Sequence, residues 1–253
     1  MTRDARTLAS IDVGRTRRVV SRATPAMRID LDMPVSSVDG PFGELADVII
    51  DPSSRRLTHI VVAPHDQRHR ARMLPTSSAH AGDAEGFALE GLALDCTAAA
   101  INESEPIQES AYLRIGERIE GGSDWDVGIQ DDYPIPDGGS LGPEIMGSGM
   151  SIEYDQHVGV NYHRIPKGDV EIRRSSDVLS ADGHRLGHVV GFVIDDDDRI
   201  TELVLEHGHL WGKRMVQIPG AAIDRFEIDE LVLALSSDEV GAIKPLPGHH
   251  WGL

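Results

Sequence analysis

The sequence is poor in cysteine, in aromatic residues and in long apolar runs. Its one cysteine, Cys96, rules out an intramolecular disulfide and any zinc site built from several cysteines. Aromatic residues make up 4% of the chain, so few large rings are available to stack on a ligand. No stretch approaches the roughly 20 apolar residues of a membrane-spanning helix, and residues 1–26 lack the apolar core of a secretion signal. We therefore expect no membrane contact and a cytoplasmic location.

Positive charge is also scarce. The chain has 24 Lys and Arg residues against 42 Asp and Glu residues, which gives a formal net charge of −18. A protein of this charge repels nucleic-acid phosphates and anionic membrane surfaces. The composition argues against a nucleic-acid partner and favours a protein partner with a basic surface.

The first residues differ in charge from the rest. Residues 1–26 hold six arginines and two aspartates, a net charge of +4, which leaves −22 for the remaining chain. This weakly periodic segment predicts a disordered basic leader. Alternatively, Met27 is the true start and the preceding residues are not translated. Residues 1–26 could also be a regulatory arm, or could fold back on the acidic body through electrostatic attraction.

What the sequence does contain is an internal repeat. Residues 38–51 and 181–195 both read Asp-Gly, a short spacer, Gly, a polar residue and an apolar run closed by Asp. Two further pairs of segments follow in the same order: residues 57–62 with 200–205, and 73–75 with 217–219. Self-similarity of this kind indicates two copies of one structural unit.

The repeated pieces have a physical logic. Asp-Gly tolerates the positive φ of a tight turn, and the glycine that follows, Gly43 or Gly187, suits a bend or a close backbone approach inside a strand. Residues 48–50 and 203–205 are short, β-rich runs. Short strands with turn signals between them predict a small antiparallel barrel or sandwich.

On these motifs, both copies resemble the PRC-barrel family. The resemblance covers about residues 33–96 and 172–236, and it implies two small six-stranded antiparallel β-barrels. It also implies a contact or adaptor role without catalysis or a cofactor. The expected organisation is a first barrel at 27–100, a second at 166–240, and a C-terminal tail at 241–253.

The segment between the copies has a different composition. Residues 102–157 carry thirteen carboxylates and two arginines, together with several glycines and prolines. For residues 101–165 we therefore predict an irregular, acidic linker. Its apolar residues, among them Trp125 and Tyr133, predict partial order through docking on a barrel. These two rings are candidate binding residues.

A second set of candidates lies in the second repeat. His207 and His209 have the spacing that places two imidazoles on one face of a strand, and Trp211 follows them. The main interpretation is a hairpin in which His209 and Trp211 offer a binding surface and no metal is bound. The alternative is a metal-binding protein or metal-dependent enzyme that uses His207 and His209 with carboxylates such as Asp195.

Catalytic motifs do not accompany these candidates. The chain has no Gly-x-Ser-x-Gly elbow, no phosphate-binding Gly-Lys-Ser/Thr loop and no His-Glu-x-x-His pair. We expect a non-enzymatic binding or scaffold protein that acts as an adaptor in a cytoplasmic assembly. The sequence leaves two arrangements open: a homodimer formed through barrel edges, and pairing of the two barrels within one chain.

Overall fold

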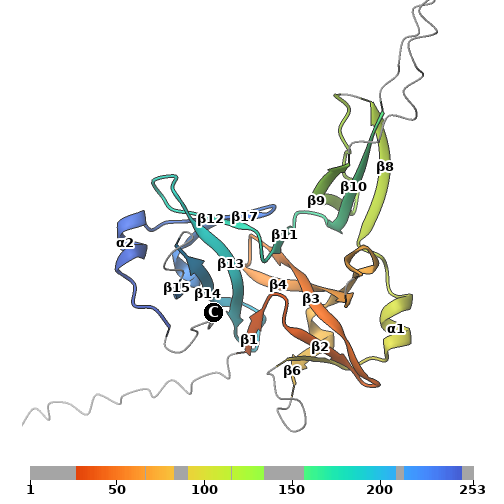
Figure 1. The fold of residues 1–253 in the computed structure, drawn as a ribbon, viewed down its shortest axis with the longest axis horizontal. Helices are drawn as coiled ribbons and strands as arrows, with labels where there is room; N and C mark the ends of the chain where they lie inside the picture. Colours follow the sequence, from red (N-terminus) through yellow and green to blue (C-terminus); the bar gives the residue numbers. More distant parts are fainter. Residues whose placement is uncertain are drawn as a thin grey trace, which may run out of the picture.

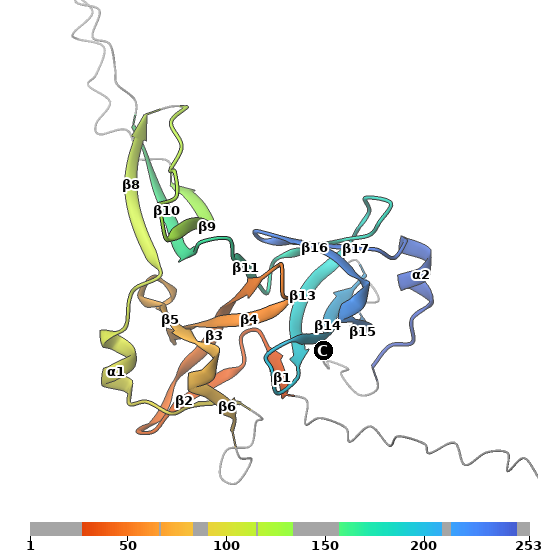
Figure 2. The same cartoon turned by 180° about the vertical axis from the view of Figure 1, so that it is seen from behind.

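The computed structural model describes residues 27–65, 67–82, 91–114, 116–133, 157–208 and 214–246. Most of them lie in β-strands, which confirms a mainly β protein. Two sheets lie side by side and a third projects from them, as two opposite views show (Figures 1 and 2). The α-helices in these ranges, Ala98–Glu103 (α1) and Ser237–Ala242 (α2), have six residues each. None of the described helices is long and apolar enough to cross a membrane.

The two repeats fold into sheets of the same topology. In the first, the strand order is β5-β4-β3-β2-β7-β6, and in the second it is β15-β14-β13-β12-β17-β16. Each sheet contains one parallel pair, β2 with β7 and β12 with β17. A 3-10 turn stands at the same place in each repeat, Thr76–Ser78 (η2) and Gly220–Ala222 (η4).

The strands of the first repeat are β2 (Pro34–Ser37), β3 (Gly40–Asp51), β4 (Arg56–Pro64), β5 (Arg72–Pro75), β6 (Ala79–Ala81) and β7 (Leu92–Leu94), with the 3-10 turn η1 (Arg68–Arg70) before β5. The strands of the second are β12 (Asp177–Leu179), β13 (Arg185–Ile194), β14 (Ile200–His207), β15 (Arg214–Pro219), β16 (Ile223–Glu227) and β17 (Glu230–Leu233).

The repeated glycines occupy the positions that their chemistry requires. Gly40 and Gly183, in the Asp-Gly turns, have φ values of 126° and 78°. A Cβ atom on Gly43 would overlap the carbonyl oxygen of Ala63, and one on Gly187 would overlap that of Glu206. These two glycines therefore let the backbones of β3 and β13 approach those of their neighbours β4 and β14 closely.

Two closed barrels are not confirmed. The first sheet is a curled half-barrel, and no pairing among the described residues joins its end strands β5 and β6. In addition, each sheet takes a seventh strand from the other repeat. β1 (Met27–Asp30) precedes β2 in sequence but pairs with β13, and β11 (Val170–Arg173) precedes β12 but pairs with β3.

This exchange of strands merges the two repeats around one hydrophobic core. Ile29 of β1 lies opposite Phe192, and Ile172 of β11 lies opposite Val48. All four side chains are fully buried and belong to one apolar cluster that extends through both sheets. The repeats are therefore packed against each other and are not two separate domains joined by a linker.

The segment between the repeats is more regular than the prediction of an irregular linker. β8 (Gln108–Arg114), β9 (Trp125–Tyr133) and β10 (His157–Pro166) form an antiparallel sheet in the order β8-β10-β9, which we call the arm. Its base rests on the first repeat, where Ile107 and Ile165 pack with Ile49 and Val61 in a second small core. Cross-strand pairing and this contact outweigh the unfavourable composition of the segment.

We predict that Gly43→Ala destabilises the protein strongly, whereas Gly241→Ala stabilises it. The new Cβ on residue 43 meets backbone that cannot move aside, so the free energy of unfolding should fall by about 3 kcal/mol or more. Gly241 lies in α2 with open space around it, and alanine there should add about 0.5–1 kcal/mol. Urea unfolding measures both changes in the free energy of unfolding. Equal midpoints for the two variants would contradict the close approach of β3 to β4 at Gly43.

A second prediction concerns the shared core. Ile29→Ala and Ile172→Ala should each lower the free energy of unfolding by about 3 kcal/mol, because each removes buried atoms at the junction of the repeats. Unfolding followed by circular dichroism and by hydrogen exchange should remain one transition that includes both repeats. Two transitions, or a loss confined to one repeat, would show that the repeats are independent.

Candidate functional site

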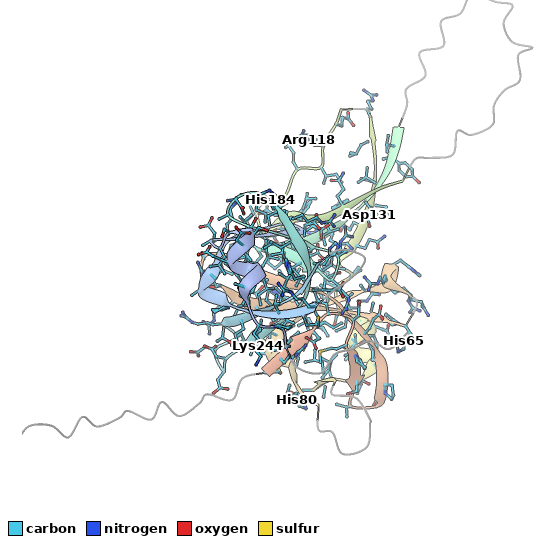
Figure 3. The ribbon with its side chains drawn as sticks, turned by 60° about the vertical axis from the view of Figure 1, so that its left-hand side comes forward. His65, His80, Arg118, Asp131, His184 and Lys244 are labelled. Carbon is cyan, nitrogen blue, oxygen red and sulfur yellow. The ribbon has the colours of Figure 1, made fainter. Side chains whose placement is uncertain are left out.

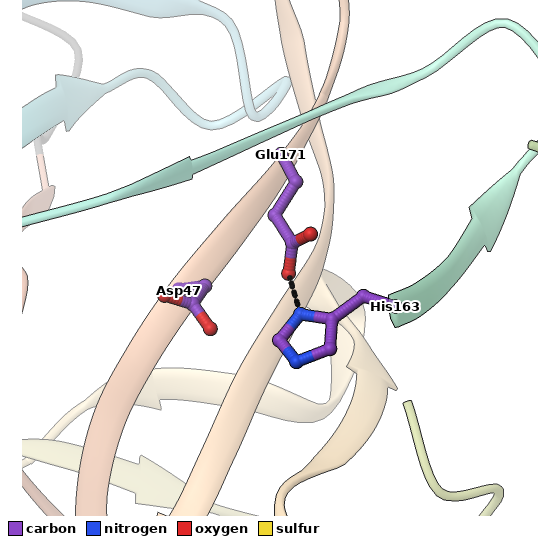
Figure 4. Close-up of side chains that lie close together, drawn as sticks. All are labelled: Asp47, His163 and Glu171. Carbon is purple, nitrogen blue, oxygen red and sulfur yellow. Dashed lines mark hydrogen bonds and ion pairs between the residues drawn. The ribbon is translucent and has the colours of Figure 1, made fainter. Parts of the chain in front are cut away.

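Three ionisable side chains meet where the arm joins the first repeat (Figure 4). Asp47 belongs to β3, His163 to β10 and Glu171 to β11. One nitrogen or carboxylate oxygen from each lies within 4.8 Å of the other two. In the part of the chain that the structure describes, this is the one group of three such side chains close enough to hold a metal ion. We refer to it as the triad.

The pairing of β11 with β3 places the two carboxylates on one face. Glu171 lies opposite Ile49, and Arg173 lies opposite Asp47. Alternate residues of a strand share a face, so Asp47 and Glu171 both point to the side of the sheet that Ile165 covers. The opposite face carries the main core.

The turn between β10 and β11 brings His163 to the same place. Gly168 has a φ of 84°, and its amide donates a hydrogen bond of 2.9 Å to Asp126. Lys167 donates to the other oxygen of the same carboxylate at 2.6 Å. This tight, anchored reversal explains why a residue of the arm and a residue of β11 can meet.

The arm also positions the carboxylate of Glu171. Its Oε1 lies 2.7 Å from Nδ1 of His163, and its Oε2 accepts a hydrogen bond of 2.7 Å from the amide of Ile129. Glu171 is completely buried. A Cβ atom on Gly128 would overlap Oε2, so the absence of a side chain there makes room for the carboxylate.

Asp47 is the member of the triad with the least support. It is 5% exposed, and its Oδ1 atom has no hydrogen-bond partner. Burial, followed by the negative charge of Glu171, raises the pKa of Asp47 to about 7, against the smaller opposing effects of His163, Arg68 and Arg173. An ionised Asp47 would therefore be costly unless a further cation approached it.

The imidazole of His163 responds in the opposite sense. Burial by itself disfavours the charged ring, but the hydrogen bond and charge of Glu171, together with Asp47 and Asp131, outweigh it and raise the pKa of His163. The triad therefore favours a bound positive charge at its centre, whether this is carried by a proton or by another cation.

The second repeat has no counterpart of the triad. The strand registers place Gly191 where the first repeat has Asp47, and Arg28 where it has Glu171. Arg28 forms an ion pair of 2.8 Å with Asp30 on its own strand. The fold alone therefore does not require two buried carboxylates at this position, and the triad is specific to the repeat that the arm covers.

Open crevices lie elsewhere on the described surface. One of about 330 Å³ lies between the repeats and is lined by Arg68, Arg174, His188 and Glu206 among others. Another, of about 160 Å³, lies beside Trp125 and Arg164 at the base of the arm. None of the three triad residues lines either crevice; Asp47 and Glu171 are buried, and the side chain of His163 is 17% exposed.

The residues that the sequence suggested have other surroundings. The ring of Trp125 stacks on Tyr162 with 6.1 Å between centroids, and the guanidinium of Arg164 lies 4.7 Å above it. Tyr133 ends β9, and its side chain lies outside what the structure describes, as do His209 and Trp211. Nδ1 of His207 lies 2.9 Å from the carbonyl oxygen of Leu186. Asp195 accepts hydrogen bonds from two amides of its own turn.

Sequence reasoning missed all three triad residues. A signal was present for the carboxylates, since Asp47 interrupts the apolar residues 45–50 and Glu171 lies between Val170 and Ile172. A charge inside a short apolar strand is expensive unless it is paired. No comparable signal marks His163, because its position depends on the arm.

Comparisons with known proteins leave the chain without an assigned family. No model of a known protein family matches it, and no curated protein matches it. A functional proposal therefore depends on the geometry described above.

We predict that Asp47→Asn changes the pH dependence of stability. The unfolded carboxyl group loses its proton near pH 3.8 and the folded one near pH 7, so the contribution of Asp47 to stability falls as the pH rises through that interval. Relative to the wild type, and with EDTA present, the variant should gain up to about 1 kcal/mol per pH unit between about pH 5 and 7.

Urea unfolding of both proteins at several pH values measures this difference. Taking the difference removes the contribution of groups that do not interact with Asp47, such as His59, whose pKa is lowered by burial. Asp51→Asn is the control, since hydrogen bonds from Ser53 and Ser54 lower the pKa of Asp51 to about 2 and its effect should be constant over this range. A constant difference for Asp47→Asn would contradict the raised pKa.

Proposed function

We propose that this chain is a non-enzymatic binding protein, an adaptor with two repeats of the PRC-barrel type that acts in a cytoplasmic assembly. In this proposal the paired repeats are the scaffold, and the arm is the element that recognises a protein partner. The observation that carries the proposal is the outer edge of β8.

Strand β8 forms one border of the arm. It pairs with β10 on one side, and no described strand pairs with it on the other. Both ribbon views place β8 on the outside of the molecule (Figures 1 and 2). Tyr112, in the middle of β8, is 75% exposed, more than any other large apolar side chain in the described ranges. An open strand edge with an exposed ring suits a partner that adds a strand of its own.

The arm is held in shape before any partner arrives. Glu109 of β8 accepts hydrogen bonds from the hydroxyl of Tyr162 at 2.6 Å and from Arg164 at 2.9 Å. The stack of Trp125 on Tyr162 adds a further contact across the strands. A preorganised edge loses less conformational entropy on binding. Trp125 therefore supports the arm, and the exposed ring of Tyr112 is the better candidate for contact.

Charge favours a basic partner. The chain carries −18 in total, and Glu117, Glu120 and Asp124 lie in the connection between β8 and β9. Figure 3 labels Arg118 in this connection, at the part of the arm that points away from the repeats. An acidic surface speeds the encounter with a basic protein and makes the encounter sensitive to salt.

The interior of the repeats also supports a binding role. Apolar side chains fill the shared core of the two sheets, and the triad does not line the crevices described above. The alternative of a metal-dependent enzyme built on His207 and His209 stays a separate hypothesis, because His209 lies outside the described residues.

The test compares two exposed apolar residues. The full wild-type chain is first used to capture proteins from a native-host lysate. Any captured protein is purified, and its affinity is measured for the wild type, for Tyr112→Ser and for Val38→Ser. Val38 is 68% exposed in the turn before β3, far from the arm, and serves as the matched control. We expect Tyr112→Ser to lower the affinity for the purified partner at least about tenfold. We expect Val38→Ser to leave this affinity unchanged.

Salt and concentration separate the remaining outcomes. Affinity should fall as the salt concentration rises if the partner is basic. Equal affinity for Tyr112→Ser and the wild type would exclude the β8 edge. A dimer that dissociates on dilution and is lost in Tyr112→Ser would show that the edge binds a second copy of this chain and not a different protein.

A further inference from the structure

The triad offers a set of donor atoms that divalent metal ions accept. It combines one imidazole nitrogen with two carboxylates, and a donor atom from each lies within 4.8 Å of the others. The residues come from three strands, β3, β10 and β11, which are brought together by the fold. A mixed nitrogen and oxygen set of three suits zinc, which takes four ligands and often completes them with water. It does not suit calcium, which needs six to eight oxygens.

An independent observation also points to a missing ligand. Asp47 is more than nine-tenths buried, and its Oδ1 atom has no hydrogen-bond partner. In Figure 4 the carboxylate of Asp47 faces the imidazole of His163. Buried carboxylate oxygens in folded proteins are nearly always satisfied by a donor or a metal ion. The carboxylate that carries this unsatisfied atom also contributes an oxygen within 4.8 Å of the two other ligand atoms.

Nearby cations do not fill this position, because carboxylates elsewhere hold them. Arg173 lies opposite Asp47 in the strand pair, but its guanidinium makes two hydrogen bonds to Asp229, at 3.1 and 2.7 Å. Arg68 pairs with Asp32 at 2.7 Å and with Glu44 at 3.4 Å. Within the triad, the imidazole of His163 is thus the one side chain that can offset the negative charge of the two carboxylates.

The surroundings hold the ligands in a fixed orientation. The amide of Ile129 binds one oxygen of Glu171, which leaves Oε1 directed at His163. Gly128 provides the space for that carboxylate. Supporting contacts of this kind orient metal ligands in known sites. The second repeat, with Gly191 and Arg28 at the equivalent positions, lacks both the ligands and the cover.

We propose that Asp47, His163 and Glu171 form an internal zinc site that fastens the arm to the first repeat. The ion binds one atom of each residue and a water molecule. The donor atoms of a tetrahedral zinc site lie about 3.3 Å apart, so His163 Nδ1 and Glu171 Oε1 move slightly apart from their present 2.7 Å if both bind directly. The role is to fasten the arm, since His163 belongs to the arm while Asp47 and Glu171 belong to the sheet beneath it, and it is independent of which partner the arm recognises.

The test uses the full chain without an affinity tag, because added histidines would bind zinc themselves. Protein is stripped with EDTA, dialysed, and titrated with Zn²⁺ by calorimetry, with bound metal counted by mass spectrometry. We expect one tightly bound zinc ion per chain. Asp47→Asn and His163→Gln should each weaken binding at least about 100-fold.

The matched control is His188→Gln. His188 also lies beside a carboxylate, 3.4 Å from Asp177, but it is on the surface and has no second ligand of the triad type. This variant should bind zinc like the wild type. Circular dichroism checks that each variant is folded, and if Asp47→Asn fails to fold, His163→Gln carries the comparison, since its side chain is partly exposed.

A second measurement tests the structural role. Zinc should slow hydrogen exchange of amides in β9 and β10, among them Ile129, in the wild type and in His188→Gln but not in His163→Gln. Mg²⁺ and Ca²⁺ should have no such effect. The proposal is overturned if the wild type binds no zinc. It is also overturned if Asp47→Asn and His163→Gln bind zinc as tightly as the wild type, which would place the ion on surface histidines instead.

Discussion

The antiparallel pairing of β11 with β3 determines most of what is particular to this molecule. It takes a strand that belongs by sequence to the second repeat and adds it to the sheet of the first. With the reciprocal pairing of β1 and β13, it joins the two sheets around one core. The same four residues of β11 place Glu171 and Arg173 beside Asp47 and return the arm to the body of the protein. Fold, inter-repeat contact and triad therefore depend on one short ladder of backbone hydrogen bonds.

Buried charge distinguishes the two repeats, which otherwise share strand order and turn chemistry. Where the second repeat has glycine and a surface arginine, the first has two carboxylates enclosed by the arm. Removing charges from water is costly, and the cost is offset only by close partners. A structure that maintains this arrangement in one repeat alone is better explained by a specific role than by the needs of the shared fold.

The arm connects that internal site with the outer surface. Its base carries His163 and the amide that holds Glu171, while its far border is β8, which has no described strand on its outer side. The three strands between them are cross-linked by the contacts of Trp125, Tyr162, Arg164 and Glu109. Anything that tightens the base of the arm, a metal ion included, therefore also limits the orientations in which β8 meets a partner. The proposed recognition at the edge and the proposed cation binding at the base are separate, and both involve the same three-stranded sheet.

The amino-acid sequence by itself determined the local features: the repeat, the Asp-Gly turns, the close backbone approaches at Gly43 and Gly187, and the mainly β character. These depend on steric rules that act over a few residues. The tertiary structure alone decided that each repeat gives a strand to the other, that β8, β9 and β10 form a sheet, and that Asp47, His163 and Glu171 meet. Strand partners, and contacts between residues more than a hundred positions apart, follow from the packing of complete faces against each other, and a composition rich in acidic residues and glycine does not reveal that packing.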